Sequence, residues 1–378
     1  MTTTQHYDAI VIGLGGMGSA TLYQLAQRGK FVLGIERFGI AHDKGSSHGV
    51  TRIIRLAYHE HPSYVPLMRR AYELWRDLES AADEQILHIT GSIDAGPPDG
   101  SNFNGSLLSC EEHDLPHDVL TSTELTKRFP AYRLPSDTMA VYQGDGGFLL
   151  PERCISLFVE RAQALGAVVQ TGERTLEWQP TTNGVRVRTD RGEYEAETLV
   201  ICAGAWAYRL LPALGAAAVP ERQALAWFET LQPWLYTPDA FPVFNLVVDE
   251  GQFYGFPEFG IPGFKLGKYH HFFEDVDPDT IDREPNAADE AVLRDFTEKY
   301  FPAAAGATSS MKVCMFTNSP DEHFIIDCLP DAPQVSVAAG FSGHGFKFSA
   351  VVGEIMADLA LDGATRHDIG MFKLARFD

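Results

Sequence analysis

The hydrophobic pattern at the start of the chain predicts a strand, a glycine-rich turn and a helix, in that order. Residues 7–12 form a short apolar stretch, interrupted only by Asp8, which is typical of a strand buried in a parallel sheet. Gly13, Gly15 and Gly18 follow in the pattern G-x-G-x-x-G, and a helical stretch then continues to Arg28. A helix that begins on such a turn offers backbone N–H groups to a pyrophosphate.

A second apolar strand, with the sequence FVLGIE, ends at Glu36. An acidic residue at this place can accept a hydrogen bond from a ribose hydroxyl. The two strands, the helix and the acid together favour a dinucleotide site over a chance glycine-rich turn. They do not distinguish NAD from FAD.

Helix and strand periods alternate along the rest of the chain. Helical spacing predicts helices over 64–82, 150–166 (with Pro151 in the first turn) and 287–300. Strand patterns occur near 167–171, in a hairpin over 185–204 whose last strand returns to the nucleotide sheet, and over the aromatic-rich 220–285. Residues 86–150 predict short strands among loops rich in Gly, Pro and Asn, and 334–361 predict a strand, a glycine-rich turn and a helix.

This order predicts an α/β protein in which two parts are interleaved. We expect a nucleotide-binding part of the Rossmann-like, glutathione-reductase type, built from 1–85, 150–215 and 310–378. An antiparallel-sheet α+β substrate part would comprise 86–149 and 216–309. The interleaving favours an FAD-linked oxidoreductase over an NAD dehydrogenase, which more often keeps its nucleotide fold contiguous.

Charge and composition narrow the range of partners. The chain has 30 Lys and Arg against 51 Asp and Glu, a net charge of −21, which argues against nucleic acid or an anionic membrane. No apolar run approaches a membrane span, and the N-terminal segment lacks the pattern of an export signal. The five cysteines are scattered and form no C-x-x-C, so we expect a reduced, cytoplasmic protein.

Two segments carry basic residues in patterns that suit an anion. In the glycine-rich turn GFSGHG, Gly343 and Gly345 precede Lys347, which could face the negative end of a reduced flavin. The alternative is an ordinary turn followed by a solvated lysine. Arg52 and Arg55 lie three residues apart and could hold a carboxylate, or they could form surface ion pairs.

The segment FKLGKYHHF and the isolated Cys314 leave further alternatives open. Lys265 could face an apolar cofactor pocket and favour electron transfer to oxygen, or it could be a solvent-facing strand residue. The neighbouring histidines have no third ligand at a suitable spacing, so no metal site is predicted. Cys314 has no partner thiol nearby, and without further information it is a small buried hydrophobe.

Blocks along nearly the whole chain resemble one family. They include GLGGMGSA, GSSHGVTRIIRLAY, YGFP, FKLGK, DPDTIDRE, CMFTNSPDEHFIID and AAGFSGHGFKFS, in family order and near family spacing. The sequence resembles the monomeric sarcosine oxidase and N-methyl-L-tryptophan oxidase family, within the glycine oxidase and D-amino-acid oxidase group. The resemblance implies FAD bonded covalently through the sulfur of Cys314.

The resemblance also implies roles for the basic and aromatic residues. Arg55 and Lys347 would bind the substrate carboxylate, and Tyr254 would line the pocket. Lys265 would activate oxygen beside the flavin. Arg52 and His48 would lie next to the flavin ring, and His270 would be the histidine of the pocket, with His271 or Tyr269 as alternatives.

The implied activity is oxidation of N-methyl amino acids with oxygen, giving the amino acid, formaldehyde and hydrogen peroxide in a monomeric enzyme. Val50, Phe316 and Asn245 depart from the sarcosine oxidase pattern, which leaves the preferred side chain open. Oxidation of another secondary or cyclic amino acid, a flavin dehydrogenase that uses a carrier, and a non-catalytic flavin sensor are the alternatives.

Overall fold

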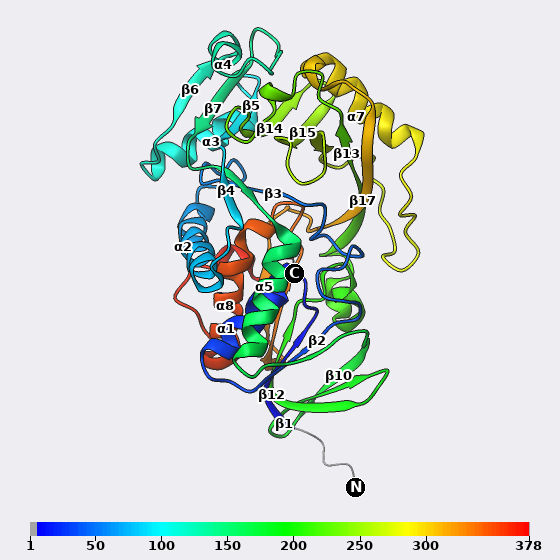
Figure 1. The fold of residues 1–378 in the computed structure, drawn as a ribbon. Helices are drawn as coiled ribbons and strands as arrows, with labels where there is room; N and C mark the ends of the chain where they lie inside the picture. The colour runs from blue at the N-terminus through cyan, green and yellow to red at the C-terminus, as the bar shows by residue number, and fades with distance from the viewer. Residues whose placement is uncertain (1–5, 378) are drawn as a thin grey trace.

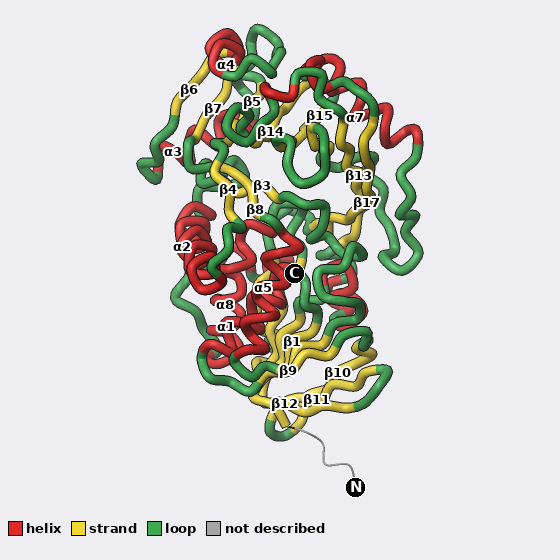
Figure 2. The backbone as a smooth tube through the Cα atoms, in the orientation of Figure 1, coloured by secondary structure: helices red, strands yellow, loops and turns green. Residues whose placement is uncertain are grey.

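Three β-sheets organise residues 6–377, which are the residues that the computed structural model describes. The two large sheets lie toward opposite ends of the molecule, and a small three-stranded sheet lies between them (Figures 1 and 2). The prediction about an export signal concerns the N-terminal segment, whose first five residues lie outside the described range. No helix within 6–377 is long and apolar enough to cross a membrane.

The first large sheet contains the expected nucleotide-binding unit. Its strands are β1 (His6–Ile12), β2 (Val32–Ile35), β9 (Val168–Gln170), β10 (Thr175–Thr181), β11 (Gly184–Thr189), β12 (Glu193–Ile201), β18 (Ile325–Leu329) and β19 (Ala332–Ala339). β1 pairs in parallel with β2 on one side and β12 on the other, and β12 also pairs in parallel with β19. The return of the 185–204 hairpin to this sheet is therefore confirmed.

The second large sheet is antiparallel except for one pair. Its strands are β5 (Ser92–Gly96), β6 (Asp118–Thr121), β7 (Met139–Gln143), β13 (Val219–Phe228), β14 (Val243–Val248), β15 (Gly251–Phe256), β16 (Phe264–Lys268) and β17 (Thr308–Asn318). β5 and β14 form the parallel pair. The third sheet joins β3 (Arg52–Ile54), β4 (Leu87–Ile89) and β8 (Gly147–Leu149).

The α-helices are α1 (Gly16–Gln27), α2 (Tyr64–Ala82), α3 (Ser101–Glu112), α4 (Ser122–Arg128), α5 (Pro151–Ala164), α6 (Ala207–Leu210), α7 (Ala287–Tyr300) and α8 (Ser349–Asp362). α2, α5 and α7 confirm the predictions from helical spacing, and Pro151 stands in the first turn of α5. α1 packs against both α5 and α8 (Figure 1).

Two sequence-based expectations differ from the structure. The Gly, Pro and Asn-rich stretch after Gly96 contains α3, because Phe103 and Cys110 are buried on one side of it and Asn102 bonds neighbouring strands. β17 belongs to the second sheet, where it pairs with β13, although it falls within the 310–378 segment expected in the nucleotide-binding part. The pairing runs along nearly the whole length of β13, and the stretch 313–317 of β17 is buried there.

The two faces of the second sheet differ in chemistry. One face carries the aromatic core, including Phe244, Phe253 and Phe264, over which α7 packs through Phe296. Side chains directly opposite each other in paired strands point to the same face. The register therefore places a second set of residues on the other face, which we call the site face: Cys314, Lys265, Tyr254, Asn245 and Asp94.

The first glycine-rich turn permits a test of the packing at α1. A Cβ atom at Gly18 would overlap the carbonyl oxygen of Gly13, whereas a Cβ at Gly15 would meet no atom within 4 Å. We expect Gly18→Ala to lower the free energy of unfolding of the apoprotein by about 1–3 kcal/mol, because the helix must move away from the turn. Gly15→Ala is the matched control, and equal denaturant midpoints for the two variants would contradict this account.

Candidate cofactor and substrate site

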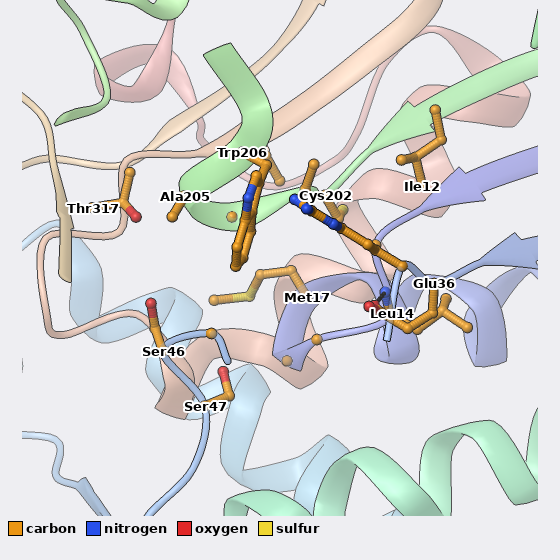
Figure 3. A pocket seen from close by; sticks show the side chains of 18 of the residues that line it. Ile12, Leu14, Met17, Glu36, Ser46, Ser47, Cys202, Ala205, Trp206 and Thr317 are labelled. Atoms are coloured by element: carbon orange, nitrogen blue, oxygen red, sulfur yellow. Dashed lines mark hydrogen bonds between the residues drawn. The ribbon is translucent and has the colours of Figure 1, made fainter. Parts of the chain in front are cut away.

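A cavity of about 580 Å³ lies where β1, β2, β12 and β19 reach their carboxyl ends. Its walls include Gly13 and Gly15 of the first glycine-rich turn, Glu36, and Gly343 and Gly345 of the second glycine-rich turn. Figure 3 shows Leu14 and Glu36 at one end of the cavity and Thr317 at the other, with Met17 and Trp206 between them. The carboxyl edge of a parallel sheet is where open α/β folds bind ligands.

Glu36 holds the first glycine-rich turn in place. Its carboxylate accepts hydrogen bonds from the backbone N–H groups of Leu14 and Phe38, each at 2.8 Å. Burial alone would raise the pKa of Glu36, but His42 and these N–H groups hold it below its ordinary value. Gly13 has a φ of +85°, a conformation that favours glycine, and α1 begins just after it. The first-turn N–H groups of α1 have no partner within the helix.

The second glycine-rich turn lines the same cavity as the first. Gly343 has a φ of +77° and is overlain by the ring of Phe316. The turn leads into a short 3-10 helix, Phe346–Phe348, that carries Lys347 at the start of α8. The side chain of Lys347 is buried, so the solvated-lysine alternative is wrong.

Lys265 projects from the site face into the protein interior. Its Nζ donates to the carbonyl oxygens of Gly49 and Thr51 at 2.7 and 2.8 Å and to the Thr51 hydroxyl at 2.9 Å. Burial lowers the pKa of Lys265 well below its ordinary value, and Arg52 adds to this. Three acceptors match the three hydrogens of an ammonium. The solvent-facing alternative for Lys265 is therefore wrong.

Cys314 is buried on the site face beside Leu225, Trp227 and Tyr254. Burial raises the pKa of the Cys314 thiol, while the positive charges of Arg52 and Lys265 oppose that rise. A different cysteine, Cys202, lines the cavity at the end of β12. Cys314 does not line this cavity, although Phe316 and Thr317 on the same chain segment do.

His48 lies on the loop that leads into β3, and Arg52 is the first residue of that strand. Arg52 lines the cavity and donates to the carbonyl oxygens of Thr51 and Ser46 at 2.9 and 2.7 Å. His48 is buried, and neither of its ring nitrogens has a hydrogen-bond partner within residues 6–377. Burial and the charge of Arg52 lower the pKa of His48 to about 3, so its ring is neutral at physiological pH.

Arg55 and Lys347 are brought together around one aromatic ring. The guanidinium carbon of Arg55 lies 4.6 Å from the ring centroid of Tyr58, and Nζ of Lys347 lies 5.2 Å from it. The Arg55 Nη2 donates to both carboxylate oxygens of Glu60, at 3.0 and 2.9 Å. The Arg55 ion pair is thus internal and not the surface pair that spacing left open.

Tyr269, and not His270, joins the aromatic residues of the site. The ring of Tyr269 lies 5.1 Å from that of Tyr254 and 5.8 Å from that of Phe316. Both ring nitrogens of His270 are bound by carboxylates, those of Glu221 at 2.8 Å and Glu322 at 3.1 Å. Hydrogen bonds to these carboxylates raise the pKa of His270 to about 10.

His271 is also occupied, since its Nε2 lies 3.0 Å from Asp289, which forms an ion pair with Arg222. Neither histidine therefore joins the aromatic residues that line the expected substrate pocket. The expected placement of His270 in that pocket does not agree with the structure. The physical reason is local: the chain turns at His270, whose φ is +49°. This turn directs the imidazole toward the acids on β13 and the 319–324 loop.

Sequence analysis missed three polar residues near Arg55: Glu60, His59 and Asp94. Asp94 Oδ1 lies 3.6 Å from Nε of Arg55 and 3.5 Å from Nδ1 of His59. The signal for Asp94 was an acid inside the otherwise apolar strand SIDAG, since a buried carboxylate requires a compensating group. No comparable signal marked His59, which comes close to β5 only through the fold.

Comparisons with known proteins agree with this geometry. A family model described as FAD dependent oxidoreductase matches residues 8–359. Monomeric sarcosine oxidase from Streptomyces avermitilis is 42% identical over 374 residues, covering 97% of this chain and 96% of that protein. N-methyl-L-tryptophan oxidase from Salmonella enteritidis is 36% identical over 375 residues, covering 98% and 99%.

A solved structure of NikD, an unusual amino acid oxidase essential for nikkomycin biosynthesis, superposes with a TM-score of 0.85 at 27% identity, covering 98% of each chain. The glycine-rich turns, the cavity at the sheet edge and the near full-length identities lead to one assignment. The chain belongs to the family of FAD-dependent oxidoreductases that includes monomeric sarcosine oxidase and N-methyl-L-tryptophan oxidase.

Proposed function

We propose that this protein is a flavin-dependent oxidase of N-methyl amino acids, with oxygen as the electron acceptor. The observation that carries the proposal is the meeting of Arg55 and Lys347 in a buried site beside the face that bears Lys265 and Cys314. Arg55 keeps its internal partners Glu60 and Asp94. Together with Lys347 it still presents two basic side chains that suit a carboxylate, which an amino acid substrate provides. The relatives named for sarcosine and N-methyltryptophan support the substrate class.

The residues present fit FAD. The turn at Gly13–Gly15 and the first turn of α1 would hold the pyrophosphate, and Glu36 would accept from the ribose. His48, whose two buried ring nitrogens lack partners in the described part of the chain, would lie with Arg52 next to the flavin ring. We propose that the sulfur of Cys314 bonds covalently to the flavin, with Arg52 and Lys265 favouring its thiolate.

The chain's own side chains would bind and orient the substrate. Arg55 and Lys347 would hold the carboxylate, while Tyr254 and Tyr269 would restrict the position of the N-methyl group. FAD, when bound, accepts a hydride from the N-methyl carbon and supplies the route for two electrons to oxygen. Fixing the reacting carbon in one orientation is the main contribution that the protein can make to such a transfer.

Lys265 would act in the second half of the reaction. Its Nζ, held on the 49–51 segment, would place a positive charge where oxygen becomes negative as it takes up electrons. The oxidised substrate, an imine, would be hydrolysed by water to formaldehyde and the demethylated amino acid. Relatives of this chain are named monomeric, and we propose that it also acts as a monomer.

The test measures both products from the purified holoprotein. We expect sarcosine or N-methyl-L-tryptophan to bleach the flavin absorbance without oxygen, and to yield equal amounts of formaldehyde and hydrogen peroxide in air. Anaerobic bleaching without peroxide in air would instead identify a dehydrogenase that uses another acceptor. Failure of every N-methyl and cyclic amino acid tested to bleach the flavin would overturn the proposal.

The carboxylate site provides a prediction about pH. Burial and the charge of Arg55 lower the pKa of Lys347 to about 7, and Glu60 and Asp94 oppose this. Below about pH 7 Lys347 is a cation, and above it the charge is lost. We therefore expect the Kd of propionate, read from the flavin spectrum, to rise with pH above about 7 by up to about tenfold per pH unit.

Two features make this pH test specific. Burial lowers the pKa of the neighbouring His344 to about 4, so it stays neutral throughout the range. Lys347→Arg keeps its charge at every pH used and is expected to remove most of the dependence. An unchanged pH profile in this variant would show that Lys347 is not the titrating group.

A further inference from the structure

The site face of the second sheet extends beyond the residues used so far. Asn245 on β14 lies opposite Tyr254 on β15 in the register, and Asp94 on β5 lies next to Asn245 on the other side. Nδ2 of Asn245 donates to Oδ1 of Asp94 at 3.0 Å. Both side chains are buried, at 2% and 1% exposure. Tyr254, Asn245 and Asp94 thus lie side by side on neighbouring strands of the site face. The last two are polar side chains in the protein interior.

Several polar atoms around this pair have no hydrogen-bond partner among residues 6–377. They are Oδ2 of Asp94, Oδ1 of Asn245, Oδ1 of Asn102 and Nε of Arg55. Three of these four atoms are acceptors, and all four residues are at most 2% exposed. Buried polar atoms are nearly always paired, because an unpaired one costs roughly 1–3 kcal/mol.

The surrounding contacts fix the orientation of the pair. Asn102 on α3 donates to the carbonyl oxygens of Ala95 and Asn245 at 3.0 and 3.1 Å, which ties the helix to both strands. Asp94 also faces Arg55 and His59, at 3.6 and 3.5 Å. Asp94 is therefore held near the guanidinium that we assign to the substrate carboxylate, and Asn245 is hydrogen-bonded to Asp94.

We propose that Asp94 and Asn245 form the side-chain end of the substrate site and select N-methyl amino acids whose side chain carries a hydrogen-bond donor. This inference rests on the proposed function and specifies its substrate class. Oδ2 of Asp94 and Oδ1 of Asn245 accept from the donor, and an ammonium is preferred because one of the acceptors is a carboxylate. An apolar side chain leaves both acceptors unpaired.

The charges in the site agree with a cationic donor. Arg55 is flanked by two carboxylates, Glu60 and Asp94, so the substrate carboxylate enters a site whose permanent cation is already compensated. An ammonium on the substrate side chain supplies a further positive charge, which compensates the second of these two carboxylates. A hydrogen bond to a charged group contributes about 1.5–3 kcal/mol, which corresponds to a preference of about 10- to 100-fold.

The experiment compares substrates of equal shape. Nα-methyl-L-ornithine and Nα-methyl-L-norleucine differ by a terminal ammonium in place of a methyl group. N-methyl-L-serine and N-methyl-L-2-aminobutyrate form a shorter pair with a hydroxyl. We expect kcat/KM, measured by oxygen uptake, to favour ornithine over norleucine by about tenfold or more, and the serine pair to differ in the same direction by less.

Asp94→Asn is expected to reduce the ornithine preference to within about threefold of unity, mainly by raising KM for the ornithine substrate. Asp99→Asn makes the same change at an exposed site a few residues away and should leave the ratio unaltered. Asn245→Met provides an independent test if Asp94→Asn fails to fold, and it should shift the preference toward norleucine.

The outcomes separate this inference from the proposed function. If sarcosine is oxidised but both isosteric pairs give ratios near one, buried water satisfies the acceptors and the specificity proposal is wrong. A preference that persists in both Asp94→Asn and Asn245→Met would also overturn it. If sarcosine and all four substrates leave the flavin oxidised without oxygen, the proposed function itself fails.

Discussion

Replacement of Cys314 by alanine will release the flavin into the supernatant when the protein is precipitated with acid, whereas the unaltered protein will carry the yellow colour into the pellet. The expected change is from near-complete retention to none, because a thioether survives denaturation and non-covalent contacts do not. Absorbance of the two fractions near the flavin maximum measures it directly. Cys314 is buried near Arg52 and Lys265, which favour its thiolate.

The matched control for this experiment is Cys202→Ala. Cys202 lines the cavity and Cys314 does not, so geometry alone leaves Cys202 as the competing attachment point. We expect Cys202→Ala to keep its flavin in the pellet. Release from Cys202→Ala and retention in Cys314→Ala would transfer the attachment to β12, and release from neither would exclude both.

Lys265→Met will slow reoxidation of the reduced flavin by oxygen by about 10²- to 10³-fold, while anaerobic reduction by substrate changes little. The reason is that the Nζ cation acts on charge that develops only on oxygen. Stopped-flow absorbance measures the two half-reactions separately. Loss of the three hydrogen bonds to Gly49 and Thr51 is also expected to lower Tm.

Lys268→Met is the control on the same strand. Lys268 lies on the opposite face of the sheet, 5.8 Å from the ring centroid of Phe253, and its loss should leave both half-reactions unaltered. A similar decline of both half-reactions in Lys265→Met would assign Lys265 to holding the 49–51 segment, and the proposed role in oxygen reduction would be abandoned.

Local sequence signals identified the elements that carry their own pattern. α2 and α7 have clear helical spacing, and α7 has a capping box from Asn286 and Asp289, so their bounds agree with the predicted ranges. α3 has no such pattern. Its Ser, Asn and Gly residues favour turns. Burial of Phe103 and Cys110, together with the hydrogen bonds of Asn102 to the preceding strand β5 and to the distant strand β14, makes the helix favourable.

The residue types in the motifs indicated which side chains could belong to the site. They did not indicate which of two neighbouring side chains reaches it. The residue pattern left burial of Lys265 and Lys347 open, and only the family resemblance implied that Lys265 lies beside the flavin and Lys347 at the substrate carboxylate. The pairing of Arg55 with Glu60 depends on the turn after Tyr58 and has no periodic signal. His270 and Tyr269 are adjacent, so the backbone conformation of a single turn decides which of them reaches the site.

The topology of the first sheet has a consequence for how the chain is made. β1 forms early in synthesis, β12 joins it much later, and β19 pairs with β12 only near the end. At roughly 5–20 residues per second, the nascent β1–β2 pair waits on the order of tens of seconds for its last partners. Its apolar edge therefore stays unpaired during that time, and premature termination before β19 should yield aggregates instead of shorter folded proteins.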